Sequence, residues 1–262
     1  MTEIKKKKKS NLNNNNNKKD KIKIGILGGI GPEATGMFYN NLIRKFQEKG
    51  LIKSNADFPQ IIVNSIPAPE LVFETLTDED LQPYFDGLKE LDKQNPDFIV
   101  MVCNTIHLYH EEFQRKIKTP ILDIRAEVLA ELKNRNITNV TVLGTPSTVS
   151  LGLYAFPGIN YSNPSREELL ALGKAVFQFN QGFDKQTPLK IATALVEKHM
   201  GLVNKSQNLV NKHQTPTNKQ QDGGAELVLL ACTEIGVMLR NVNLPVLDPM
   251  DVLVGAVVRR CV

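Results

Sequence analysis

The sequence alternates short, mostly apolar runs with longer segments whose apolar residues follow helical spacing. The apolar runs lie at Ile22–Leu27, Gln60–Asn64, Phe98–Cys103, Ile121–Asp123, Val140–Leu143, Leu227–Cys232 and Val246–Leu247. Strands that are apolar along their length are buried on both faces, which is typical of a parallel sheet covered by helices on each side. The predicted fold class is therefore α/β with parallel sheets, and 262 residues suit two small domains of this kind.

Two stretches of low complexity fall outside this pattern. Residues 1–20 combine a lysine run with an asparagine run and cannot bury enough apolar surface to offset their ordering entropy, so a disordered tail is expected. Residues 203–224 are rich in Asn, Lys and Gln, which predicts a flexible insertion. The remaining chain is expected to divide into a first domain of residues 21–123 with about 246–262, and a second domain of residues 124–245.

Charge and composition exclude several classes of protein. The formal net charge of +4 originates near the N-terminus, where Lys5–Lys9 with Lys18, Lys19, Lys21 and Lys23 supply more positive charge than that. No basic cluster follows, so nucleic acid is not an expected partner. No run approaches the 18 or so apolar residues that cross a bilayer, so no membrane association is expected. Three cysteines, an odd number, argue against a disulfide framework and for a reducing, cytoplasmic location.

Two cysteines occupy matching positions in the two halves of the chain. Phe98–Thr105 and Leu227–Glu234 are each an apolar strand that ends in a cysteine, followed by polar residues and a helix. Ligands of open α/β sheets bind at the carboxyl ends of strands, and a helix N-terminus beside a sulfur lowers the pKa of the thiol. Cysteines are also often buried simply as small apolar residues. Two in matching contexts favour the interpretation that Cys103 and Cys232 form a functional pair.

Other cysteine chemistry explains the pattern less well. Zinc sites need a second Cys or His at short spacing, and only His107, four residues beyond Cys103, offers one, so no metal is predicted. The same histidine is a candidate base for a cysteine nucleophile of hydrolase type, but that role leaves the second matched cysteine unexplained.

A glycine turn after the first strand has two interpretations. Residues Gly29–Ala34 read G-x-G-x-x-A between a strand and a helix, as in dinucleotide-binding folds. Those folds expect an acidic residue at the end of the second strand, where this chain has Val63–Ser65. The turn can equally form an amide cradle for a carboxylate, so no cofactor is predicted and a nicotinamide oxidoreductase is kept as an alternative.

The motifs together resemble those of the aspartate/glutamate racemases. The resemblance extends from Lys23 to Val257, apart from residues 203–224, and rests on Gly25–Pro32, Cys103–His107, Gly144–Thr145, Cys232–Glu234 and Asp248–Asp251. It implies two similar Rossmann-like domains with the active site in the cleft between them, and a homodimer.

The resemblance also implies an isomerase that needs neither pyridoxal phosphate nor metal. Cys103 and Cys232 would be its catalytic residues, one on each face of the substrate Cα, because inversion needs a base on one face and an acid on the other. An acidic amino acid or a related small molecule would be the substrate. The residues implied to bind it are Gly29, Ile30, Gly31, Asn104, Thr105, Thr145, Thr233 and Glu234. Glu234 and His107 are candidates for orienting groups.

Two stretches depart from the family pattern. Aspartate racemases commonly carry an Arg after the second strand and a Lys before the conserved glycine of the second domain. Here the corresponding stretches, Ile66–Glu70 and Phe179–Gly182, contain neither cation. An unpaired buried carboxylate is costly, so aspartate is expected to be a poor substrate.

Besides the nicotinamide oxidoreductase, two further functions are alternatives to a racemase. Maleate-type cis-trans isomerases of the same superfamily keep both cysteines and would take a small dicarboxylate, whereas the similar arylmalonate decarboxylases keep only the second. A binding protein without catalytic activity is the alternative from another class.

Overall fold

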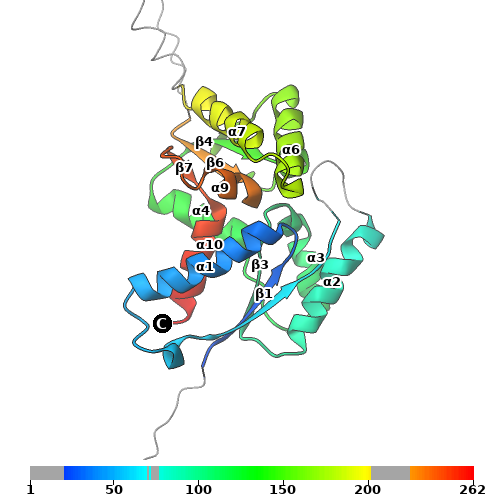
Figure 1. Cartoon of the computed structure of the whole chain (residues 1–262), viewed down its shortest axis with the longest axis vertical. Helices are drawn as coiled ribbons and strands as arrows, with labels where there is room; N and C mark the ends of the chain where they lie inside the picture. The colour runs from blue at the N-terminus through cyan, green and yellow to red at the C-terminus, as the bar shows by residue number, and fades with distance from the viewer. Residues whose placement is uncertain (1–20, 70, 72–76, 202–224) are drawn as a thin grey trace, which may run out of the picture.

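The computed structural model of the chain describes residues 21–69, 71, 77–201 and 225–262. The tail expected at residues 1–20, the insertion expected at 203–224 and Glu70 lie outside the described residues. The described chain forms two α/β units, which lie one above the other in Figure 1.

The first unit is built on a sheet of three parallel strands. These are β1 (Lys23–Gly28), β2 (Gln60–Ser65) and β3 (Phe98–Met101), in the order β2-β1-β3. The strand expected at Ile121–Asp123 is reduced to one isolated parallel bridge between Ile99 and Ile121. The reason is local, because the side chain of Asp123 already caps the next helix through the backbone N–H of Arg125.

The second unit repeats this arrangement. Its parallel strands are β4 (Asn139–Gly144), β5 (Asn160–Ser162), β6 (Leu227–Ala231) and β7 (Val246–Leu247), in the order β5-β4-β6-β7. β4 therefore corresponds to β1, and β6 corresponds to β3. The predicted fold class, α/β with two similar parallel sheets, is confirmed.

Helices cover both faces of each sheet. They are α1 (Pro32–Glu48), α2 (Asp78–Asp92), α3 (His110–Lys116), α4 (Ile124–Asn134), α5 (Pro146–Ser150), α6 (Arg166–Gln181), α7 (Gln186–His199), α9 (Thr233–Leu239) and α10 (Pro249–Arg260), with 3₁₀ turns η1 (Asn55–Asp57) and η2 (Thr105–Tyr109). Among them, none is both long and apolar enough to cross a membrane.

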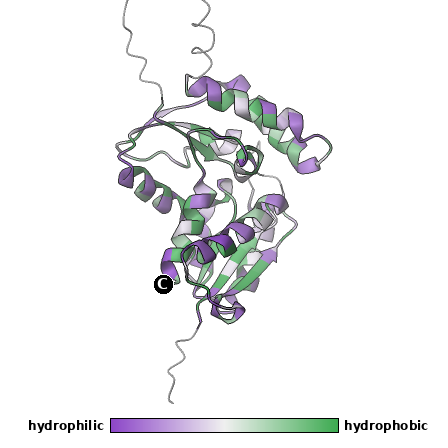
Figure 2. Ribbon diagram, turned by 60° about the vertical axis from the view of Figure 1, so that its left-hand side comes forward, coloured by the Kyte–Doolittle hydropathy of each residue, from purple (hydrophilic) through white to green (hydrophobic). Residues whose placement is uncertain are grey.

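Three apolar clusters hold the layers together. The central one joins β1, β3, β4 and β6 to α1, α4 and α10, which lie between the two sheets (Figure 1). A second cluster packs α2 and α3 on the outer face of the first sheet, and a third packs α6, α7 and α9 on the outer face of the second. The strands are largely green in the hydropathy colouring of Figure 2, whereas the helices carry both apolar and polar residues. Burial on both faces accounts for the uniformly apolar strands β3 and β6, whereas β2, at the edge of the first sheet, is partly exposed, contrary to the expectation for Gln60–Asn64.

After β7 the last helix, α10, leaves the second sheet and returns toward the first unit. β7 hydrogen-bonds to β6, while α10, which follows directly, packs against α1 and α4. The two sheets thus share one central layer of helices, and the division of the chain into domains at about residue 246 stays a prediction. This layer brings the carboxyl ends of the strands in both sheets to a common junction.

Candidate active site

A small cavity of about 20 Å³ lies at this junction, and both Cys103 and Cys232 line it. Six of the eight predicted substrate-binding residues line it as well, namely Ile30, Asn104, Thr105, Thr145, Thr233 and Glu234. The volume holds little more than one water molecule, so the walls must move apart to admit a substrate. Sequence reasoning did not identify Leu71 and Val176 as lining residues, and it noted Asn180 only within the stretch Phe179–Gly182, which lacks the lysine common in aspartate racemases.

Cys103 follows β3 and faces hydrogen-bond donors. The backbone N–H groups of Thr105 and Ile106 and the hydroxyl of Thr105 lie near its sulfur and favour the thiolate. Burial, with a smaller contribution from the carboxylate of Glu234, raises the pKa of the thiol to about 12, although the three donors act in the opposite direction.

Cys232 follows β6 and has the opposite hydrogen-bonding role. It occupies the position before the first turn of α9, and its Sγ donates to Oε2 of Glu234 at 3.1 Å. Burial raises the pKa of this thiol well above its ordinary value, and the carboxylate of Glu234 adds to the shift. The lowered thiol pKa expected from a helix N-terminus is therefore wrong for both cysteines, because burial outweighs the helix effect.

Glu234 is a buried carboxylate with one oxygen engaged and one free. Oε2 accepts from the hydroxyl of Thr233 at 2.8 Å and from Cys232, whereas Oε1 has no hydrogen-bond partner among the described residues. Burial raises the pKa of this carboxyl. A free acceptor on a cavity wall is an expensive feature unless a ligand uses it.

Asn104 provides the complementary free donor. Its Oδ1 accepts a hydrogen bond from the hydroxyl of Tyr154, and its Nδ2 has no partner within the described parts of the chain. Asn104 is 1% exposed, so this amide group is cut off from bulk solvent. The cavity is thus lined by two residues that each carry one free polar group, a donor on Asn104 and an acceptor on Glu234.

Three threonine hydroxyls connect the two units beside the thiols. Oγ1 of Thr105 lies 3.2 Å from Oγ1 of Thr145 and 2.7 Å from Oγ1 of Thr148, and the last two are 2.9 Å apart. Thr145 also caps α5 by accepting from the backbone N–H of Thr148. Two of the three threonines predicted to bind substrate, Thr105 and Thr145, are therefore already within hydrogen-bonding distance of each other across the junction, whereas Thr233 donates to Glu234.

The glycine turn contributes one side chain to the cavity. Ile30 lines it, whereas Gly29 and Gly31 do not. Gly29 has a φ of +87°, which favours glycine, and its N–H donates to Oγ1 of Thr35 at 3.0 Å. The backbone N–H of Gly29 is consequently occupied within the fold and differs from the free amide cradle that the sequence suggested.

His107 lies between two backbone carbonyl oxygens, one near each nitrogen of its ring. Nδ1 lies 2.8 Å from the carbonyl oxygen of Cys103, and Nε2 lies 3.4 Å from that of Leu122. The side chain is fully buried, and burial lowers the pKa of the imidazole to about 4. His107 does not line the cavity, and its neutral ring can donate to only one of the two carbonyl oxygens, so its role is structural.

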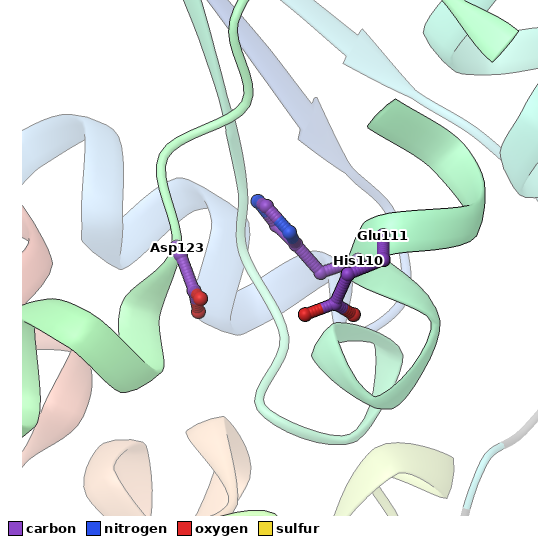
Figure 3. Close-up of side chains that lie close together, drawn as sticks. All are labelled: His110, Glu111 and Asp123. Atoms are coloured by element: carbon purple, nitrogen blue, oxygen red, sulfur yellow. The ribbon is translucent and has the colours of Figure 1, made fainter. Parts of the chain in front are cut away.

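His110, Glu111 and Asp123 form a group with the composition of a metal site (Figure 3). Their candidate ligand atoms lie within 4.8 Å of one another. Arg125, however, donates to both oxygens of Asp123 at 2.9 and 2.8 Å and to Glu111 at 2.6 Å. The guanidinium already pairs with both carboxylates, so this group is explained as an ion-pair network.

The part of the sequence that contains Cys103 matches a known protein family. Residues 27–162, just over half of the chain, match the family described as Asp/Glu/Hydantoin racemase. The chain belongs to the Asp/Glu/hydantoin racemase family. The resemblance to aspartate/glutamate racemases noted from the motifs is thereby confirmed.

Individual members of the family are similar over different lengths. The broad specificity amino-acid racemase RacX of Bacillus subtilis is 33% identical over 132 residues, which are 50% of this chain and 58% of that protein. The match to this curated relative therefore spans little more than half of the relative's length.

Solved racemase structures share the fold over nearly the whole chain. The aspartate racemase of Picrophilus torridus has a TM-score of 0.67 and 23% identity, covering 92% of this chain and 94% of its own. The aspartate racemase homologue PH1733 of Pyrococcus horikoshii has a TM-score of 0.63 and 23% identity, covering 91% and 98%. Glutamate racemase of Francisella tularensis, solved with D-glutamate, has a TM-score of 0.60 and 17% identity, covering 92% and 80%.

Proposed function

We propose that this chain is a cofactor-independent amino-acid racemase that exchanges the Cα proton of its substrate between Cys103 and Cys232. One observation carries the proposal. Two thiols from equivalent strands of a repeated sheet line a single cavity whose wall also bears a free donor and a free acceptor. Family membership supports the same class of reaction.

Inversion at Cα requires two groups with opposite protonation. One sulfur, as thiolate, forms a bond to the departing Cα proton and leaves the electron pair on Cα. The other sulfur, as thiol, gives its proton to that pair from the opposite face. After this step the first cysteine is a thiol and the second is a thiolate. In the reverse reaction the second cysteine is therefore the base and the first is the acid.

The surroundings of the two sulfurs suggest which one begins as the base. Donors face Cys103 and stabilise its thiolate, whereas Cys232 donates its own proton to Glu234. We therefore assign the thiolate of the reacting form to Cys103 and the thiol to Cys232. Because burial raises both pKa values, only a small fraction is ionised near neutral pH, and activity rises as the pH increases toward the thiol pKa.

The two free polar groups fit an amino acid better than a dicarboxylate. Nδ2 of Asn104 suits the α-carboxylate as a donor, and the carboxylate of Glu234 suits the α-ammonium as an acceptor. Maleate has no ammonium group, so the presence of Glu234 favours the racemase over the maleate-type isomerase. Family homodimers and a cytoplasmic location stay predictions for this chain.

A deuterium-exchange panel tests the proposal. Separate D- and L-amino acids are incubated with the purified chain in deuterium oxide, and the Cα proton is followed by NMR while a chiral separation follows inversion. We expect loss of the Cα signal together with formation of the opposite enantiomer for at least one amino acid. Absence of both for every amino acid in the panel would reject racemase activity.

A further inference from the structure

Tyr154 connects the second unit to the cavity residue Asn104. It lies just after α5, is 3% exposed, and donates its hydroxyl proton to Oδ1 of Asn104. Asn104 belongs to the loop after β3 in the first unit, so the bond crosses the junction between the two sheets. Tyr154 is absent from the lining of the cavity and touches it only through Asn104.

The bond decides which way the amide of Asn104 faces. The two ends of an asparagine amide differ only in that one donates and the other accepts. In the observed orientation the buried Tyr154 proton has an acceptor, and Nδ2 is left free. Rotation of the amide by half a turn would direct Nδ2 at Tyr154. Among the described residues the hydroxyl makes this one hydrogen bond, so its proton would then lose its acceptor.

The position of the tyrosine ring does not depend on this bond. The ring packs edge-on against Phe156 with centroids 6.0 Å apart and belongs to the central apolar cluster. Burial also raises the pKa of the Tyr154 hydroxyl well above its ordinary value, so the group keeps its proton. The hydroxyl is thus a permanent donor held in a fixed place.

We propose that Tyr154 is a positioning residue that holds Oδ1 of Asn104 and thereby directs Nδ2 to the α-carboxylate of the substrate. This inference rests on the racemase function proposed above. Tyr154 of the second unit would then contribute to substrate recognition by orienting Asn104 of the first unit.

Replacement of Tyr154 by Phe tests the proposal, because it removes the donor and keeps the ring. Without the hydroxyl bond the amide rotates freely, and its oxygen can oppose the substrate carboxylate. We expect KM to rise about tenfold with a smaller change in kcat, since one buried hydrogen bond to a charged group is at stake. Tyr161→Phe is the matched control. It loses a hydroxyl bond to the carbonyl oxygen of Phe156, away from Asn104, and should leave KM unchanged.

A double-mutant cycle separates positioning from general packing. In an Asn104→Ala background there is no amide to orient, so Tyr154→Phe should then add less than a twofold change in KM. Equal effects of Tyr154→Phe with and without Asn104, or an unchanged KM in the single variant, would overturn the proposal.

A further variant applies if Tyr154→Phe unfolds at the assay temperature. Asn104→Asp keeps an acceptor for Tyr154 but removes the free donor, and it should raise KM at least as much as Asn104→Ala. A KM close to that of the unaltered chain would contradict the proposed role of Nδ2. Lack of racemisation by the unaltered chain would instead reject the proposed function itself, and this inference with it.

Discussion

Oε1 of Glu234 occupies the space into which a side chain at Gly31 would extend. A Cβ built on Gly31 would lie 1.6 Å from this oxygen, far inside any allowed contact. The backbone of Gly31 is extended, with φ of −159°, so conformation alone does not require glycine here. The glycine turn of the first unit therefore makes room for the carboxylate that accepts the Cys232 proton in the second.

Replacement of Gly31 by Ala should displace Glu234 and impair catalysis. The new methyl group must push the carboxylate away, which breaks the bond between Glu234 and Cys232. We expect kcat/KM to fall by at least tenfold, since one positioned hydrogen-bonding group typically contributes that much to a rate. Steady-state kinetics with the best substrate of the panel measures the change.

Gly36→Ala provides the control on the same helix. A Cβ at Gly36 meets nothing within 4 Å, and alanine is the better helix former by about 1 kcal/mol. This variant should melt at a slightly higher temperature and keep its activity. If Gly31→Ala were as active as Gly36→Ala, the link between Gly31 and Glu234 would have no catalytic importance.

Aspartate should be a poor substrate, and a lysine at position 180 should improve it. Asn180 lines the cavity together with the carboxylate of Glu234, which repels a second substrate carboxylate. Asn180→Lys supplies an opposing charge, so kcat/KM for aspartate relative to alanine should rise several-fold. Asn180→Gln, which has similar bulk without the charge, should leave that ratio unchanged. The interpretation is wrong if the unaltered chain prefers aspartate over all other amino acids.

Asp248 should make stability depend on pH in an identifiable range. It caps α10 by accepting from the backbone N–H of Met250 at 2.9 Å. Burial, with a smaller contribution from Asp251, raises the pKa of its carboxyl from 3.8 to about 7. Because folding raises this pKa, the protonated carboxyl contributes its full stabilisation below pH 3.8, the pKa in the unfolded chain. This contribution is lost as the pH rises toward the folded pKa of about 7.

Asp248→Asn tests this dependence because asparagine also caps helices but carries no charge. The Tm of the variant relative to the unaltered chain should be higher at about pH 8 than at about pH 5, by roughly a few degrees. If the difference in Tm between the variant and the unaltered chain were the same at both pH values, ionisation of Asp248 would not destabilise the folded protein.

The sequence predicted the elements that are defined by local pattern. Runs such as Leu227–Ala231 are apolar at every position, and burial on both faces leaves no other arrangement for them. β5 was not foreseen because its three residues, Asn160–Ser162, are polar or half-buried and pair with β4 only through the tertiary fold. The short strand expected at Ile121 failed for a related reason, since the capping of α4 by Asp123 ends the pairing after a single bridge.

The residues of the candidate site that follow the carboxyl end of a strand could be predicted from the sequence. Cys103, Asn104 and Glu234 lie two or three residues beyond the end of β3 or β6, so the parallel topology places them at one edge. Val176 and Tyr154 reach the site from helix and loop positions whose direction depends on packing between the units. The direction of the thiol pKa shifts also escaped sequence reasoning, because the depth of burial is a property of the complete fold.

The most direct test of the two-thiol account is proton exchange by the two single variants Cys103→Ser and Cys232→Ser, with Cys261→Ser as control. Cys261 lies at the end of α10, away from the cavity, so its variant should racemise normally. Serine is far less acidic than cysteine, so each active-site variant loses one base and keeps the other. Racemisation should fall by several orders of magnitude in both.

The measurement is Cα deuterium incorporation from deuterium oxide, followed by NMR separately for the D- and L-enantiomers of the best substrate. The account predicts that each active-site variant retains exchange with one enantiomer only, and that the two variants retain opposite enantiomers. Near-normal racemisation by Cys103→Ser or Cys232→Ser, or retention of the same enantiomer by both, would contradict it.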